Sequence, residues 1–258
     1  MIRTWLELPP MGIFLTLTAL YFGLVVALRI LFFCAPFRRP MQSLNGIVAP
    51  FFNASAILFA LLAGFLANDI TDRSRQAYRA VQTEAGELRN VYTLSVAALA
   101  DMAAIREALK AYATSVTTDE WPAMEEGHGS PRTSAAYDEL LRKISDPSIA
   151  KSSGNAVHAA LLNAAVHAGN ARTERLAIAS DHTNDLKWIV VIALGLITEI
   201  SIALVHLDRP RAMTAALVVF ASAAVITLTL VAFQEYPFYG TFRLSPAPIA
   251  ETIRLLGG

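Results

Sequence analysis

The chain has 258 residues, of which 55% are hydrophobic and 16% are charged, and its formal net charge is zero. This composition is too apolar for an ordinary soluble domain. The balanced charge and the lack of a basic block exclude a typical nucleic-acid-binding protein, so we expect no nucleic acid as a partner. The class that remains is a membrane protein.

Four runs with no charge, or with a single one, reach the length of about 20 residues that a helix needs to cross a bilayer. In chain order they are Met11 to Leu28, Pro40 to Asn68, Trp188 to Leu207 and Ala212 to Phe233. The first run is too long for the apolar part of a signal peptide, and no small-residue cleavage site follows it, so we expect it to be retained. The sequence therefore predicts four membrane-spanning helices.

The second run has two stripes at helical spacing. Small residues, which let helices approach closely in lipid, recur at every fourth position: Ala56, Ala60 and Gly64. Large apolar residues follow one position later: Ile57, Leu61 and Phe65. Periodicity alone favours contact of the large residues with lipid or a neighbouring helix. Around a shared axis, however, several copies would stack them into apolar rings, a constriction that gates ions by dewetting.

Two polar residues within these apolar runs are candidates for a functional role. Asn53 is near the start of the second run, where it either forms an interhelical hydrogen bond or makes a polar ring above the constriction. Glu199 is near the middle of the third run, and an ionised carboxylate at the bilayer centre costs about 2.5–3.5 kcal/mol on insertion scales. Such residues usually face a bundle interior, a partner or water, which makes Glu199 a candidate functional residue. The alternative is a protonated or interfacial carboxyl.

Residues 69–187 hold most of the charged residues of the chain and read as a water-facing helical domain. From Leu88 to Val116 apolar residues, with Ser95 as the exception, recur at spacings of three and four, which predicts an amphipathic helix. No Gly, Pro or turn cluster separates this helix from the second apolar run. We therefore expect one helix from the second span to Val116, either unbroken or with a kink near Asn68.

Turn signals divide the remainder of this domain. A loop is expected where Pro122, Gly127 and Gly129 cluster, followed by a helix that Ser130 caps and that ends before Pro147. From Ile149 onward the chain is rich in alanine, which predicts a second long helix leading straight into the third span. The predicted fold is all-α: four transmembrane helices with a helical extramembrane domain between the second and third. The corresponding segments are 1–68, 69–187, 188–233 and 234–258.

Other chemistry has little support in the sequence. The single cysteine, Cys34, allows no disulfide framework or cysteine metal site, and the five histidines lack metal-ligand spacing. There is also no Gly-rich phosphate loop, nucleophile elbow or metalloprotease helix. We expect no enzymatic activity, no metal and no cofactor.

The stretch GFLANDITDRSRQAYRAVQTEAGELRNVYTL resembles the segment that follows the pore helix in bacterial bestrophins. There a Phe at the helix end precedes an Asn, an Asp-Arg pair and an Arg-Asn pair. The matching residues here are Phe65, Asn68, Asp72, Arg73, Arg89 and Asn90. Three shorter motifs resemble the bestrophin-like family of uncharacterised bacterial membrane proteins: EWPxM (Glu120, Trp121, Pro122, Met124), PFxG (Pro237, Phe238, Gly240) and SPxP (Ser245, Pro246, Pro248).

This resemblance implies an ion channel of the bacterial cytoplasmic membrane that is oligomeric around a central axis, a pentamer in bestrophins, with the second helix lining the pore. The apolar neck would consist of Ile57, Leu61 and Phe65. Polar and charged residues on the pathway would be Asn53, Asn68, Asp69 and Asp72. The resemblance does not carry ion selectivity over; in the channel interpretation, rings of Asp69 and Asp72 past Phe65 would favour cations. The expected partners are further copies of the chain, inorganic ions and the lipid bilayer. Calcium gating is not implied, because TFRLSPAP replaces the acidic run that forms the calcium site of animal bestrophins.

Two questions stay open at the level of sequence. The first is orientation, because the short connections carry four arginines: Arg38, Arg39, Arg209 and Arg211. The positive-inside rule makes these connections cytoplasmic and the helical domain external, whereas bestrophin topology implies a cytosolic domain. The second is function, since a membrane-anchored helical sensor or scaffold without ion conduction fits the same pattern. A sensor needs an output domain, and residues 234–258 are too few for one, which favours the channel.

Overall fold

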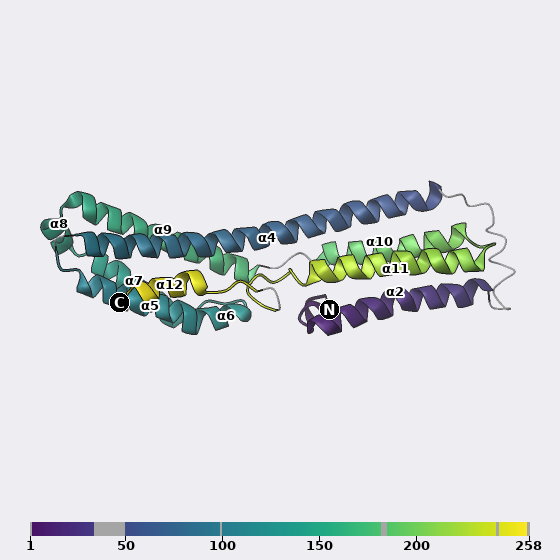
Figure 1. Cartoon of the computed structure of the whole chain (residues 1–258), viewed down its shortest axis with the longest axis horizontal. Helices are drawn as coiled ribbons and strands as arrows, with labels where there is room; N and C mark the ends of the chain where they lie inside the picture. The colour runs from purple at the N-terminus through teal and green to yellow at the C-terminus, as the bar shows by residue number, and fades with distance from the viewer. Residues whose placement is uncertain (1, 34–49, 99, 182–184, 241–242, 257–258) are drawn as a thin grey trace. The chain divides into compact units, whose positions relative to one another are not determined.

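The computed structural model describes residues 2–33, 50–98, 100–181, 185–240 and 243–256, and the regular elements within these ranges are all helices (Figure 1). The chain divides into two compact units. Residues 1–72 and 183–235 form one, which we call the membrane unit, and residues 73–182 and 236–258 form the other, which we call the extramembrane unit. The predicted all-α class is confirmed.

The membrane unit contains α1 (Ile2–Leu6), α2 (Pro10–Phe33), the first part of α4 (Pro50–Ala97), α10 (Asp185–Val205) and α11 (Pro210–Ala232). Four of these helices, all except α1, are long and apolar enough to cross a membrane. The prediction of four spanning helices is therefore confirmed. The predicted start of the second span at Pro40 lies outside the described residues.

Packing in the membrane unit is closest between α2 and α11, with α10 against both. The helix α2 buries one residue per turn on this side: Ile13, Leu17, Tyr21, Val25, Leu28 and Phe32. Gly195 of α10 is required for the fit, because a Cβ there would collide with the Tyr21 hydroxyl. The first part of α4 contacts α11 through Phe59 and Phe220, whose ring centroids are 5.5 Å apart.

The extramembrane unit contains the remainder of α4 and seven further helical elements. They are α5 (Ala103–Ser115), η1 (Val116–Glu120), α6 (Trp121–Glu125), α7 (Pro131–Ile144), α8 (Pro147–Ser153), α9 (Asn155–Ser180) and α12 (Ala247–Leu255). The helix α5 packs against α7 and α12, and α7 against α9. One apolar core joins these helices to α4, with Leu88, Leu109 and Leu161 fully buried at its centre.

The prediction of one helix to Val116 is wrong. The helix α4 ends at Ala97, and α5 runs antiparallel to it. Two hydrogen bonds show this direction: Arg106 bonds to Ser95 near the end of α4, and Tyr112, farther along α5, bonds to Glu84, which comes earlier in α4. Asp101 starts the new helix by accepting a hydrogen bond from the amide of Ala103, a role that suits aspartate better than a helix interior. The spacing of three and four continues through the turn, so periodicity could not detect it.

The second long helix also differs from its prediction. Gly154, with φ of +86°, separates α8 from α9, and α9 ends at Ser180 because Asp181 has extended backbone. The predicted helix straight into the third span is therefore interrupted. Ser130 does cap α7, with its side chain accepting a bond from the amide of Thr133, and α7 ends before Pro147 as expected. Part of the expected loop is helical, since Pro122 lies in the first turn of α6, where proline is tolerated.

Candidate functional site

The helix α4 buries one face along its whole length and exposes the other. In the membrane unit the buried residues are Phe59, Ala63, Leu66 and Ile70, and in the extramembrane unit they include Ala77, Val81, Leu88 and Val91. On the opposite face the side chains of Ile57, Leu61 and Phe65 are 65%, 49% and 58% exposed. With 3.6 residues per turn, the same face continues through the exposed Asn68 and the half-buried Asp72. We call these five residues the α4 stripe.

The structure thus brings the three residues of the predicted neck onto one uncovered face. The neighbouring small residues do not serve packing within the described part of the chain, since a Cβ added at Gly64 would have no atom within 4 Å and Ala60 is exposed. Large apolar side chains beside unused small residues are typical of a helix surface that contacts something outside its own chain.

The predicted polar residues lie along the same helix with different partners. Asn53 is exposed. Asn68 donates a hydrogen bond of 3.0 Å to the carboxylate of Asp72, one turn farther along. Asp69 is at the side of the stripe and forms an ion pair with Lys187, so its charge is compensated within the membrane unit. Sequence reasoning did not anticipate this lysine partner.

Glu199 is on a different helix, α10, and its side chain is fully buried. Neither of its carboxyl oxygens has a hydrogen-bond partner among the described residues. The nearby hydroxyl of Tyr21 donates instead to the carbonyl of Ile192, at 3.5 Å. Among the environments expected for Glu199, the structure places it in the interior of the helix bundle, away from the molecular surface.

A buried charge cluster in the extramembrane unit was missed at the level of sequence. The guanidinium of Arg175 bonds to Glu84 on α4 (Nε to Oε2, 2.7 Å) and to Glu120 on η1 (Nη2 to Oε2, 2.9 Å). Glu120 also accepts a bond of 2.6 Å from Arg172, and Glu84 accepts one of 2.6 Å from the hydroxyl of Tyr112. Two arginines therefore balance two carboxylates, with every charged group paired.

The cluster has identifiable local causes. Arg172 and Arg175 are three residues apart and share one face of α9, while the π-helical turn η1 ends at Glu120 and directs it inward. Burial raises the pKa of the Glu120 carboxyl, but the hydrogen bond from Arg172 and the charge of Arg175 outweigh it and hold this pKa below its usual range. A usable sequence signal existed: Glu84 falls on the apolar face of α4, where a charge needs a partner.

The short family motifs also have structural roles in this unit. Trp121 lies 5.4 Å from the guanidinium carbon of Arg175 and packs edge-on against Phe238, with centroids 5.6 Å apart. Gly240 has a φ of +86°, which other residues rarely adopt. Ser245 accepts a hydrogen bond from the amide of Ala247 at the start of α12. EWPxM, PFxG and SPxP thus fix the C-terminal segment within the extramembrane unit.

Four long apolar helices joined to a helical unit rich in charge define a multi-pass membrane protein. The family model of the Bestrophin-like domain matches residues 19–249. The chain therefore belongs to this family, as the sequence motifs predicted. No curated protein matches the chain.

Solved structures support the same fold. A point variant of a bacterial bestrophin homolog from Klebsiella pneumoniae is similar with a TM-score of 0.74 and 14% identity, over 94% of this chain and 97% of that chain. Another variant of that homolog is similar with a TM-score of 0.73 and 13% identity, over 95% of this chain and 99% of that chain. The crystal structure of a membrane protein variant is similar with a TM-score of 0.74 and 13% identity, over 94% of this chain and 97% of that chain. At these identities the likeness establishes the shared fold.

Proposed function

We propose that the chain is the subunit of a homo-oligomeric ion channel, with a pentamer as the favoured assembly, in the bacterial cytoplasmic membrane. The helix α4 lines the pathway, and Ile57, Leu61 and Phe65 form its apolar neck. The observation that carries this proposal is the α4 stripe, because a single exposed face of one unbroken helix changes from large apolar to polar and charged residues.

In this assembly each copy places its stripe toward a shared axis. The rings of Ile57, Leu61 and Phe65 exclude water from a narrow neck, so conduction depends on whether the neck is wetted. Asn53 gives a polar ring at one end of the neck, and Asn68 with Asp72 gives another at the other end. Asp69 lies beside the stripe, and its charge is compensated by Lys187. The small residues Ala60 and Gly64 let neighbouring copies approach closely.

Glu199 has a separate role in this proposal. Because it is buried on α10, it supports packing or proton sensitivity of the bundle without contacting the ion. No enzymatic step is assigned to any residue. The sensor or scaffold function remains the second hypothesis, which the experiment below addresses.

The test is the current through purified protein in planar bilayers under a salt gradient, with the variant Phe65→Ala. Widening the neck should raise the conductance or the leak. The matched control is Phe14→Ala, since Phe14 is an exposed phenylalanine on α2, outside the stripe. Silence from wild type and both variants, with the oligomer intact, would reject conduction and favour the scaffold.

A further inference from the structure

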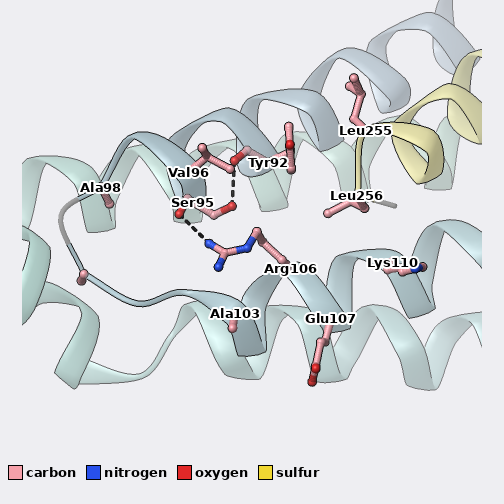
Figure 2. Close-up of a pocket in the computed structure, with 11 residues that line it drawn as sticks. Tyr92, Ser95, Val96, Ala98, Ala103, Arg106, Glu107, Lys110, Leu255 and Leu256 are labelled. Carbon is pink, nitrogen blue, oxygen red and sulfur yellow. Dashed lines mark hydrogen bonds between the residues drawn. The ribbon is translucent and has the colours of Figure 1, made fainter. Parts of the chain in front are cut away.

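The extramembrane unit has an open pocket of about 670 Å³ where the end of α4, the start of α5 and the end of α12 meet (Figure 2). There Arg106 donates a hydrogen bond of 2.9 Å to the carbonyl of Ser95, and its Nη2 is 3.7 Å from a carboxylate oxygen of Asp101. Among the described residues that line this pocket, no buried polar side chain lacks a partner. The pocket therefore carries no sign of a specific ligand.

The buried group that lacks a partner at the greatest cost is the carboxyl of Glu199, in the membrane unit. Its side chain is fully buried on α10, and neither of its oxygens has a hydrogen-bond partner among the described residues. The other buried side-chain groups without a partner in the described part of the chain are hydroxyls. A buried charge costs far more free energy than a buried hydroxyl, so Glu199 needs an explanation that the hydroxyls do not.

No described cation pairs with this carboxyl. The helix α10 packs against α11 and α2, and the charged residues of those two helices are Arg211 and Arg29. Both arginines are exposed, and Arg29 bonds to a threonine hydroxyl of α11 at 3.4 Å. At the start of α10 itself, Lys187 forms an ion pair with Asp69. The cations of these helices are therefore directed to the surface and not to Glu199.

Polar groups of α10 are also engaged. Thr198 and Ser201 each donate a hydrogen bond of 2.8 Å to the backbone carbonyl one turn earlier. The Nδ1 of His206, two turns after Glu199, lies 2.9 Å from a backbone carbonyl. The short helix α1 contacts α10 at Trp188, about three turns before Glu199. These groups leave the carboxyl without a counter-charge.

A hydroxyl that can change its acceptor lies beside Glu199. Tyr21 of α2 is fully buried, and its hydroxyl is so close to Gly195 that a Cβ there would collide with it. Gly195 is one turn before Glu199, and long side chains on a helix lean toward the preceding turn. The hydroxyl bonds to the carbonyl of Ile192 at 3.5 Å, the outer limit of a hydrogen bond, so little is lost when it turns to a better acceptor.

We propose that Glu199 is a reversible proton-binding site of the membrane unit. The carboxyl holds a proton at neutral pH, because an ionised carboxylate without a counter-charge is costly in an apolar interior. When the proton leaves, the hydroxyl of Tyr21 turns from the carbonyl of Ile192 to the new carboxylate. The site extends the proton sensitivity of Glu199 in the proposed channel, and because its test records no current, its failure is distinct from a failure of the channel.

The first test is infrared spectroscopy of the full chain in nanodiscs at neutral pH. A protonated carboxyl has a C=O stretching band that a carboxylate lacks, so wild type should show an acid band that Glu199→Gln loses. The control Glu120→Gln removes a buried carboxyl that two arginines pair, and it should keep the band. If the difference between wild type and Glu199→Gln consists of carboxylate bands instead, Glu199 is ionised and the proposal is overturned.

The second test follows the acid band as the pH is raised and lowered again. In wild type the band should give way to carboxylate bands in alkaline solution and return on acidification. Tyr21→Phe removes only the hydroxyl, and its acid band should persist to a pH about one unit higher, the usual effect of losing one hydrogen bond to a charged group. The control Tyr78→Phe, at an exposed tyrosine of α4, should titrate like wild type. An acid band that never titrates, or equal titration of Tyr21→Phe and wild type, would overturn the proposed exchange.

Discussion

Glu199 of the membrane unit differs sharply from the buried carboxylates of the extramembrane unit. In the extramembrane unit Glu84 and Glu120 are fully buried, and each is paired with Arg175. In the membrane unit Glu199 is equally buried, and its oxygens have no partner among the described residues. The extramembrane unit thus uses charge pairs to fix its helices in place. The membrane unit relies mainly on apolar packing. Its other buried carboxyl, Glu235, accepts a hydrogen bond of 3.2 Å from the indole of Trp188, whereas Glu199 forms no contact among the described residues that would explain it structurally.

The largest expected effect comes from breaking the charge cluster. Arg175→Met removes the partner of two buried carboxylates and should destabilise the extramembrane unit by about 3–5 kcal/mol, the usual cost of an uncompensated buried charge. Chemical denaturation of the protein in nanodiscs measures this. Arg132→Met is the control, because Arg132 is an exposed arginine whose ion pair with Asp119 is at the surface. Equal stability of the two variants would contradict the structural role of the cluster.

A smaller effect should follow pH. Because the pKa of Glu120 is lower in the folded protein than in the unfolded chain, the stability it contributes is present above the unfolded pKa of about 4.3 and is lost as pH falls through the folded pKa. Unfolding measured between about pH 3 and 7 should therefore show a loss of stability at the acid end, and Glu120→Gln should reduce that slope. The control is Glu174→Gln, an exposed position on α9. An unchanged slope in Glu120→Gln would disprove the coupling.

The smallest expected effect is that of the corresponding glutamate-to-glutamine substitution at Glu199 in the membrane unit. Glu199→Gln keeps the size of the side chain and breaks no hydrogen bond or ion pair that the structure describes, so the stability should change by less than about 1 kcal/mol. The same denaturation experiment measures it. If Glu199→Gln costs as much stability as Glu120→Gln, then Glu199 has a partner in the assembled protein, and the contrast between the units fails.

Much of the fold could be predicted from the sequence, because hydrophobic length and charge distribution determine where a chain crosses a bilayer. The four spans, the helical class and the Ser130 cap followed from such local signals. The break between Ala97 and Ala103 did not, since apolar spacing continued through it and the local contact at the start of α5 is a single hydrogen bond from the amide of Ala103 to Asp101. The end of α9 at Ser180 was missed for a related reason: alanine-rich sequence predicts a helix but not where it stops.

Only part of the candidate site could be predicted from the sequence. The face of α4 that carries Ile57, Leu61 and Phe65 could be derived from periodicity, but its exposure depends on which helices pack against the opposite face. The ion pair of Asp69 with Lys187 joins residues far apart in the chain, and spacing cannot reveal it. The charge cluster was hidden for the same reason, although an acidic residue on the apolar face of α4 was a visible sign.

The central claim, that α4 lines an ion pathway whose neck is wetted when it conducts, has a direct test. In a Cys34→Ser background, which removes the single native cysteine, Leu61→Cys should react with a charged, water-soluble thiol reagent added during recording, and the current should fall. Phe14→Cys on α2 should give no change, because we expect that side chain to face away from the pathway. Equal insensitivity of the two variants, with currents intact, would show that Leu61 does not line the conducting path and would contradict the proposed pore.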